Sequence, residues 1–471
     1  MDVQPLNSAW QTDIPLYLQL YRRYRDAITS GQLLPGKRVL SVRSLASELH
    51  VARGTVEMAY QMLVSEGYFE TRGAAGTWVS PQLATLQETG KSTRSKGYLT
   101  AQSNPMSPIE KMLPFQLGLP ALDAFPRKVW SRVSGQTVRM LDSEMMNYPD
   151  PVGYRPLREA IAIYLGLSRG ITCTADQVLI TTGYQGALER VCRAILHLGD
   201  EGWYEDPGYL FARHYLQQMG MILNPIPVDD EGLQVDVGWQ RAPQARFAVV
   251  TPSHQSPTGV ALSLPRRLAL LAWANQQKAW IIEDDYDSEF RYHGHPLPAL
   301  KSLDHEQRVL YIGTFSKVLF PGLRLAYLVV PPALLPIFHQ AANHSPGPGS
   351  ILPQAIVASF MQQGQFARHL RKMRQLYVIR RGYLLEALQR ITDSPLHVQP
   401  QAGGIQVLAR LNKQLCDQTL AQKAQAAGLG VQALSEWSVG ESPQNGLLMG
   451  FTNFTSAQEA QTAVERLSLL L

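Results

Sequence analysis

The 471-residue chain contains little cysteine and no long apolar run. Its only cysteines are Cys173, Cys192 and Cys416. Three scattered cysteines are too few for a disulfide framework or a zinc site, and they suit a reducing cytoplasm. The N-terminus has no signal-peptide pattern, and no stretch approaches the ~18 apolar residues that a membrane helix needs. We therefore expect a cytoplasmic protein with no membrane partner and no metal.

Disorder is also excluded as the main state, because 45% of the residues are hydrophobic and only 17% are charged. The net charge of +5 is concentrated in one short segment near the N-terminus. The basic residues of that segment are Arg22, Arg23, Arg25, Lys37, Arg38, Arg43 and Arg53, opposed only by Asp26 and Glu48. A local basic surface favours a polyanion as partner, and the alternative is a solvated helix face.

The chain divides by composition into two domains and a linker. Residues 81–113 are rich in Ser, Thr, Gln, Lys and Pro and show no sustained apolar period, as is typical of a linker. We therefore predict a small domain at 12–80, a linker at 81–113 and a larger domain at 114–471.

The pattern of the small domain predicts three helices followed by a β-wing. Apolar residues recur at helical spacing from residue 17 to residue 28, and Ser41 can cap a second, short helix. In the third helix the residues expected to face inward are Val56, Tyr60, Leu63 and Val64. The segment 68–80 reads as two short strands around a glycine turn. This order is the helix-turn-helix layout, and the alternative is a helical dimerisation module.

A helix-turn-helix would place Arg53 and Thr55 at the start of the recognition helix, where side chains reach base edges. Arg43 would meet phosphate, and Arg72 would lie in the wing. The segment 14–79 resembles the winged helix-turn-helix of GntR-type regulators through the motifs PLYxQxY, IxSGxLxPG, SxRxLA, VxRxTVxxAY and LxxEGY. The chain departs from the usual pattern at Leu40, where Pro is usual, and at Ala52, where Ser or Thr is common.

This resemblance implies a double-stranded DNA operator as the partner. The residues that would contact the DNA are Ser41, Arg43, Arg53, Thr55 and Arg72.

The larger domain alternates short β-branched runs with helical stretches. The buried-strand candidates are 178–182, 247–252, 280–285 and 309–314. Such alternation predicts an α/β domain with a mostly parallel central sheet, whose ligands bind at the carboxyl ends of the strands.

Polar residues follow these strands. The segment 182–185 opens a helix, whose free N–H groups can bind phosphate. The acidic run 283–285 could bind a metal or perform acid–base chemistry, but no His lies nearby at metal-ligand spacing. Lys317 lies in an apolar setting after a strand, where a desolvated amine can act as a nucleophile, and the alternative is a surface lysine.

Five motifs follow one another in the order TTGYQGAL, DPGY, TPSHQSPTG, EDDYDSEFRY and SKVLFPGLR. In this order they resemble the fold-type I aminotransferases, which depend on pyridoxal 5'-phosphate (PLP). The resemblance implies Lys317 as the catalytic, Schiff-base lysine, Asp284 at the pyridine nitrogen, Tyr286 at the phenolic oxygen and Tyr209 stacked on the ring. It implies a phosphate site made by Tyr184, Gln185, Thr314, Ser316 and Arg324. Tyr148 would reach the phosphate of a neighbouring subunit, which implies a homodimer.

The chain departs from these aminotransferases near its C-terminus, where Leu448 stands in place of the Arg that clamps the substrate carboxylate. The alternative is that Arg213 or another arginine takes that role. A GntR-type domain joined to an aminotransferase-like domain resembles the MocR/GabR group of regulators. The resemblance implies a PLP-dependent, DNA-binding transcriptional regulator, a head-to-tail dimer whose large domain senses a small amine, an amino acid or PLP. The alternatives are an active aminotransferase with an appended DNA-binding domain, and a dimeric scaffold that has lost PLP.

Overall fold

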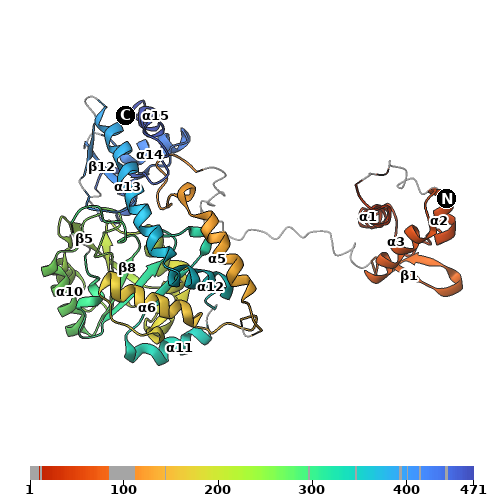
Figure 1. Cartoon of the computed structure of the whole chain (residues 1–471), viewed down its shortest axis with the longest axis horizontal. Coiled ribbons are helices and arrows are strands. Elements are labelled where there is room, and N and C mark those ends of the chain that lie inside the picture. Colours follow the sequence, from red (N-terminus) through yellow and green to blue (C-terminus); the bar gives the residue numbers. More distant parts are fainter. Residues whose placement is uncertain are drawn as a thin grey trace. The chain divides into compact units, whose positions relative to one another are not determined.

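The computed structural model describes residues 10, 13–83, 112–143, 145–294, 297–344, 347–391, 395–399, 401–412, 415–440 and 444–471. The chain divides into two compact units, Met1–Ser107 and Pro108–Leu471 (Figure 1). Most of the predicted linker lies outside the described residues. None of the helices in the described ranges is long and apolar enough to cross a membrane.

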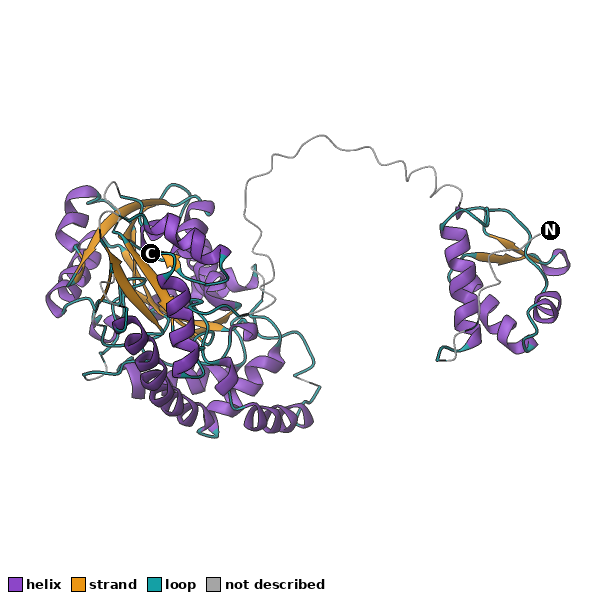
Figure 2. Ribbon diagram, turned by 90° about the horizontal axis from the view of Figure 1, so that it is seen from above, coloured by secondary structure: helices purple, strands orange, loops and turns teal. Residues whose placement is uncertain are grey.

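The smaller unit is a three-helix bundle with a wing (Figure 2). Its elements are α1 (Leu16–Thr29), α2 (Val42–Glu48), α3 (Arg53–Ser65), β1 (Phe69–Thr71) and β2 (Thr77–Val79). Ser41 caps α2 by accepting a hydrogen bond from the backbone N–H of Ser44 at 3.1 Å. Tyr24, Tyr60 and Phe69 pack edge to face at the centre of the unit, which ties α1, α3 and the wing together.

One prediction for this unit is wrong. Val64 is 36% exposed, and the inward face of α3 consists of Val56, Ala59, Tyr60 and Leu63. These four residues follow the spacing i, i+3, i+4, i+7, which forms one stripe along a helix. The next residue, Val64, is turned about 100° away from Leu63 because a helix has about 3.6 residues per turn.

The larger unit is built on an eight-stranded sheet in the order β3-β10-β9-β8-β7-β4-β5-β6. Its strands are β3 (Val178–Thr181), β4 (Glu201–Asp206), β5 (Ile222–Asp229), β6 (Gly232–Leu233), β7 (Phe247–Val250), β8 (Trp280–Asp285), β9 (Val309–Thr314) and β10 (Ala326–Val329). Strands β5, β4, β7, β8 and β9 pair in parallel, while β10 runs antiparallel between β9 and β3. The mostly parallel α/β sheet expected from the sequence is confirmed.

Helices cover this sheet, and a second sheet lies toward the C-terminus (Figures 1 and 2). The helices are α5 (Arg127–Arg139), α6 (Arg155–Arg169), α7 (Gly183–Ile195), α8 (Leu210–Gln218), α9 (Val235–Arg241), α10 (Leu264–Gln277), α11 (Leu335–Asn343), α12 (Ile351–Gln362), α13 (Gln365–Gln389), α14 (Asp417–Ala426) and α15 (Ala457–Ser468). The second sheet, in the order β11-β12-β14-β13, consists of β11 (Leu396–Val398), β12 (Gln406–Leu411), β13 (Gln432–Ala433) and β14 (Gly446–Gly450).

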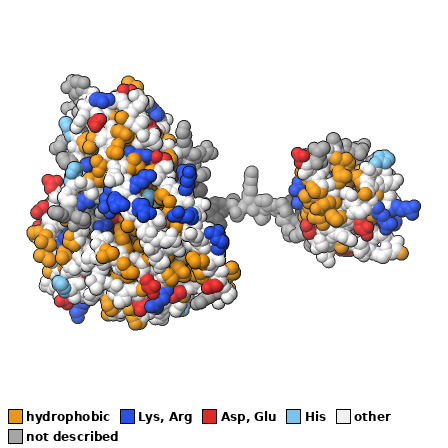
Figure 3. Space-filling view, viewed as in Figure 1, with side chains coloured by type: hydrophobic (Ala, Val, Ile, Leu, Met, Phe, Trp, Pro, Cys, Tyr) orange, Lys and Arg blue, Asp and Glu red, His pale blue; other side chains and the backbone are white. Residues whose placement is uncertain are grey.

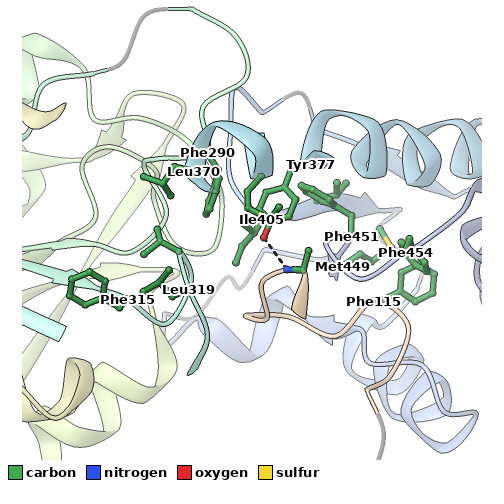
Figure 4. Packing of buried hydrophobic residues seen from close by; sticks show 14 of the residues in the cluster. Phe115, Phe290, Phe315, Leu319, Leu370, Tyr377, Ile405, Met449, Phe451 and Phe454 are labelled. Atoms are coloured by element: carbon green, nitrogen blue, oxygen red, sulfur yellow. Dashed lines mark hydrogen bonds between the residues drawn. The ribbon is translucent and has the colours of Figure 1, made fainter. Parts of the chain in front are cut away.

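A continuous apolar core joins the two sheets, and the long helix α13 runs along it (Figure 4). Tyr377 of α13 is fully buried there and packs on Phe290 and Phe451. Its hydroxyl accepts a hydrogen bond from the backbone N–H of Ala121 at 2.9 Å, the dashed line in Figure 4. This bond holds the segment that leads from residue 112 into the large unit.

The substitution Tyr377→Phe should lower the free energy of unfolding by about 1–3 kcal/mol, because it leaves a buried backbone N–H unsatisfied. Urea denaturation of the full chain would measure the change. Tyr383→Phe, on the same helix, is the control and should change stability by less than about 0.5 kcal/mol. Equal effects of the two substitutions would show that the Ala121 bond contributes nothing.

Candidate functional site

The strand ends bring the predicted cofactor residues to one edge of the central sheet. Asp284 on β8 lies opposite Ile312 on β9, and Ala326 on β10 lies between Thr314 of β9 and Thr181 of β3. The carboxyl ends of β3, β8 and β9 therefore share an edge, which is where α/β folds bind ligands.

Lys317 lies in the turn that follows β9 and is half-buried. Its Nζ donates a hydrogen bond to the carbonyl of Gly118 at 2.7 Å. Burial lowers the pKa of this amine, and the negative charges of Asp287 and Asp284 oppose the shift. A Cβ on Gly118 would lie 2.9 Å from the amine, so the glycine leaves room for it.

Asp284 is a buried carboxylate near this amine. Burial raises the pKa of Asp284 to about 8, the nearby Tyr184 hydroxyl opposes the rise, and the charges of Asp285, Glu205 and Asp287 add to it. A buried carboxylate with a raised pKa lacks a sufficient positive partner, so its environment favours a cationic ligand group.

Two tyrosines lie over the same region. The rings of Tyr184 and Tyr209 pack edge to face with centroids 6.0 Å apart. Burial raises the pKa of Tyr209 to about 12, the charge of Asp284 adds to the rise, and the charge of Arg324 opposes it. The Tyr184 hydroxyl is buried and lies near Asp284, whose pKa it lowers. The structure thus brings Tyr184, Tyr209, Asp284 and Arg324 together.

The predicted phosphate loop forms the start of α7. Gly183, the first residue of α7, has a φ of +78°, and a Cβ there would lie 3.1 Å from the guanidinium of Arg324. The preceding residue provides no side-chain cap, so the first N–H groups of the helix are free to meet an anion. Arg324 and Gln185 are exposed, and the Thr314 hydroxyl accepts from the Ser316 N–H at 3.2 Å.

Tyr286 has a partner that sequence reasoning missed. Nδ1 of His254 lies 3.0 Å from the Tyr286 hydroxyl and 3.0 Å from Oδ1 of Asp287. Burial is the main cause that raises the pKa of Tyr286 well above its usual range. His254 belongs to the motif TPSHQSPTG, which the sequence analysis singled out without assigning a role to this histidine.

Two predicted residues lie elsewhere. Tyr148 is 97% exposed. Within the described ranges it makes no contact with the other predicted cofactor residues. Leu448 on β14 is fully buried in an apolar cluster with Leu408, Leu434 and Trp437, and this cluster packs against Leu117 and Tyr209. Arg213 lies beside this cluster and donates to the Trp437 carbonyl at 3.3 Å.

The candidate DNA-binding residues lie on the surface of the smaller unit. Arg43, Arg53 and Ser41 are exposed, and Thr55 is half-buried on α3. Arg72 in the wing lies 3.4 Å from Glu70 and stacks over the Trp78 ring at 5.3 Å. An exposed pair of this kind contributes little stability, so it would yield readily to a phosphate.

Lys37 and Arg38 are a second set that the sequence interpretation did not assign to the site. The segment 37–39 hydrogen-bonds along β2, with Val39 N–H to Thr77 and Val79 N–H to Lys37. Both basic side chains are exposed and extend the wing surface that carries Arg72. Figure 3 shows basic side chains gathered at one edge of the smaller unit. The run of basic residues was the signal, but only the strand pairing places it in the wing.

Comparison with known proteins follows the same division. The GntR family of bacterial regulatory proteins matches residues 16–79, and the class I and II aminotransferases match residues 124–458. The probable rhizopine catabolism regulatory protein MocR of Rhizobium meliloti is 36% identical over 93% of this chain and 90% of its own length. This chain belongs to the MocR-type regulators of the GntR family.

Another HTH-type regulator and two solved aminotransferase structures also match most of the chain. The pyridoxine biosynthesis regulator PdxR of Corynebacterium glutamicum is 32% identical over 95% of this chain and 93% of its own. An archaeal alanine:glyoxylate aminotransferase shares the fold, with a TM-score of 0.71 over 83% of this chain and 93% of its own at 24% identity. The α-aminoadipate aminotransferase LysN of Thermus thermophilus, solved with N-(5'-phosphopyridoxyl)-L-leucine, has a TM-score of 0.69 at 29% identity, over 76% of this chain and 92% of its own.

No group of three or more His, Cys, Asp or Glu side chains in the described ranges could hold a metal ion. The acidic run at the end of β8 has other partners instead. Glu283 accepts the backbone N–H groups of Leu300 and Lys301, and Asp285 accepts from Tyr311 and lies 3.0 Å from Arg169. Asp284 alone of this run faces the cofactor residues.

The raised pKa of Asp284 predicts a pH dependence of stability for protein purified without cofactor. The pKa of Asp284 is about 8 in the folded chain, whereas the ordinary value of 3.8 applies in the unfolded chain. Stability should therefore fall as pH rises between these values, by up to about 1.4 kcal/mol per pH unit from this group.

Asp284→Asn removes this term, because the amide does not titrate. Urea denaturation at about pH 5 and about pH 9 should show that the variant gains stability relative to the unsubstituted chain only at the higher pH. Two stability curves that run parallel with pH would contradict the assignment.

Proposed function

We propose that this chain is a PLP-dependent transcriptional regulator that binds an operator through its GntR-type domain and senses a small molecule in its aminotransferase-like domain. The observation that carries the proposal is the enclosed Lys317 amine beside the buried Asp284 carboxylate, in a chain that also carries an exposed basic recognition helix.

The residues at the sheet edge fit PLP in charge and in shape. The N-terminus of α7, Arg324, Thr314 and Ser316 would hold the phosphate, with Gly183 leaving room for it. Asp284 would pair with the ring nitrogen, Tyr209 would stack on the ring, and Tyr286 would donate to the phenolic oxygen. When bound, PLP supplies an aldehyde that reacts with amines. The lowered pKa of Lys317 keeps its amine available for that aldehyde.

On the DNA side, Arg53 and Thr55 lie at the N-terminal end of α3, the part of a recognition helix that reaches base edges. Ser41 caps α2, and with Arg43 it would meet phosphate, as would Arg72 in the wing together with Lys37 and Arg38. The operator is double-stranded DNA, which places the protein in the cytoplasm. The exposed Tyr148 suits a contact with a second copy, so the regulator would be a homodimer.

The effector is a small amine, an amino acid or PLP itself. It would act by binding one arrangement of the dimer more tightly than another, because a ligand shifts an equilibrium only by its differential affinity. The alternative is an active aminotransferase, which the likeness to LysN favours. The leucine at position 448 weighs against it, because this side chain offers no cation to an α-carboxylate, and misplacement of a substrate costs rate.

Lys317→Arg should abolish the visible absorbance band of lysine-bound PLP, because a guanidinium keeps the charge but is no nucleophile. The measurement is an absorbance spectrum of purified protein after PLP is added and unbound PLP is removed. The exposed Lys128 provides the control, and Lys128→Arg should keep the band. A band that survives in the Lys317 variant would remove Lys317 from its role.

Arg53→Ala should weaken specific DNA binding by about 1–3 kcal/mol if Arg53 contacts a base. The probe is a duplex selected from a random pool by the full-length protein, and fluorescence anisotropy at fixed salt gives the affinity. Arg246→Ala removes an equally exposed charge from the larger unit and should leave the affinity unchanged. The same affinity in both variants would take Arg53 off the contact surface.

A further inference from the structure

A small pocket lies beside the ring of His254. Side chains of Ser253, His254, Asp287 and Arg291 line it together with the backbone at Gly404, and its volume is about 10 Å³. This volume is close to that of one water molecule, about 10–15 Å³ measured in the same way.

Four buried polar atoms of these side chains have no hydrogen-bond partner in the part of the chain that the structure describes. They are Ser253 Oγ, His254 Nε2, Asp287 Oδ2 and Arg291 Nε. The hydroxyl and the Arg291 Nε–H can donate, while a carboxylate oxygen and an unprotonated imidazole nitrogen accept. One water molecule offers two donors and two acceptor sites, which matches this set.

The other ring nitrogen of His254 fixes where its proton lies. Nδ1 is 3.0 Å from Oδ1 of Asp287, which as a carboxylate only accepts. Nδ1 therefore carries a proton and donates it. It is also 3.0 Å from the Tyr286 hydroxyl, and a protonated Nδ1 cannot accept from that hydroxyl. The Tyr286 proton is thus left to point elsewhere.

The backbone of Gly404 holds the His254 ring in this place. Gly404 has a φ of +87°, and a Cβ at this position would lie 2.2 Å from His254 Cε1 and 2.6 Å from Nε2. The glycine thus allows the chain that leads into β12 to pass directly against the ring edge. With Asp287 on the opposite side, the ring has little freedom to turn.

We propose that His254 is a positioning residue, which a single buried water and Asp287 hold with Nδ1 protonated, so that Tyr286 presents its hydroxyl proton to the cofactor's phenolic oxygen. The water donates to His254 Nε2 and Asp287 Oδ2 and accepts from Ser253 and Arg291. The positioning of Tyr286 toward the phenolic oxygen rests on the proposed function, whereas the water site does not depend on a cofactor.

The first test is a pH titration of the visible band of the PLP-loaded protein, compared between His254→Asn and His254→Gln. The asparagine amide can stand near the Nδ1 position and keep a donor there, whereas the longer glutamine amide reaches the Nε2 position. His254→Asn should keep the titration midpoint, and His254→Gln should raise it by on the order of one pH unit, because a hydrogen bond that stabilises the phenolate is lost.

The control is the same substitution in a chain that carries Tyr286→Phe. If His254 acts through Tyr286, His254→Gln should shift the midpoint no further in that background. Equal shifts with asparagine and glutamine, or a glutamine shift that persists without the Tyr286 hydroxyl, would overturn the positioning role and leave the proposed function intact. A PLP-treated, unsubstituted protein without any visible band would instead overturn the proposed function, and the phenolic-oxygen part with it.

The second test needs no cofactor. A crystal structure of the cofactor-free full chain, at a resolution that resolves ordered waters, should show one water within hydrogen-bond distance of His254 Nε2 and Asp287 Oδ2. A dry pocket, or direct contacts that satisfy both atoms, would overturn the water site.

Discussion

The larger unit depends on placing an amine and a carboxylate together inside a protein core. Lys317 and Asp284 lie at the ends of neighbouring strands. Burial lowers the pKa of Lys317 and raises the pKa of Asp284, so that each group is driven toward its neutral form. Desolvation of both groups costs free energy that folding must offset elsewhere. Buried ionisable groups with shifted pKa values are typical of functional sites. Here the two groups lie near the start of α7, where Gly183 is next to the exposed Arg324. This edge therefore suits a ligand that carries both an anionic and a cationic group, as the proposed PLP does.

Much of this arrangement could be predicted from the sequence, because strands and their carboxyl-terminal residues are local in the chain. The four predicted strands 178–182, 247–252, 280–285 and 309–314 correspond to β3, β7, β8 and β9. The same locality explains α3, whose apolar periodicity lies within a few turns. Val64 was misplaced because the stripe on α3 drifts around the helix, and only packing decides where it ends.

The residues that were missed depend on contacts across long stretches of the chain. His254 meets Tyr286 and Asp287 across 32 and 33 residues, and Gly404, which is more than a hundred residues away, fixes its ring. Lys37 and Arg38 belong to the wing only because their backbone pairs with β2. Neither the His254 contacts nor the pairing with β2 produces a periodic pattern of residues in the sequence. Roles for the cofactor residues came from a resemblance in motif order, and the geometry is compatible with them.

The balance between sensing and catalysis turns on one apolar cluster. Leu448, Leu408, Leu434 and Trp437 pack beside Tyr209 and Leu117, where the chain leads to the carbonyl that holds Lys317. The side chain of Leu448 offers no cation to a substrate carboxylate, whereas Arg213 lies beside the cluster and donates to the Trp437 carbonyl.

The most direct measurement is an absorbance titration of the PLP-loaded full chain with primary amines and amino acids, followed by a keto acid, with operator binding recorded on the same samples. We predict a saturable spectral change with at least one ligand, a parallel change in operator affinity, and no product from the keto acid. Sustained turnover of an amino acid, with operator affinity unchanged, would contradict the account and identify the large unit as an enzyme.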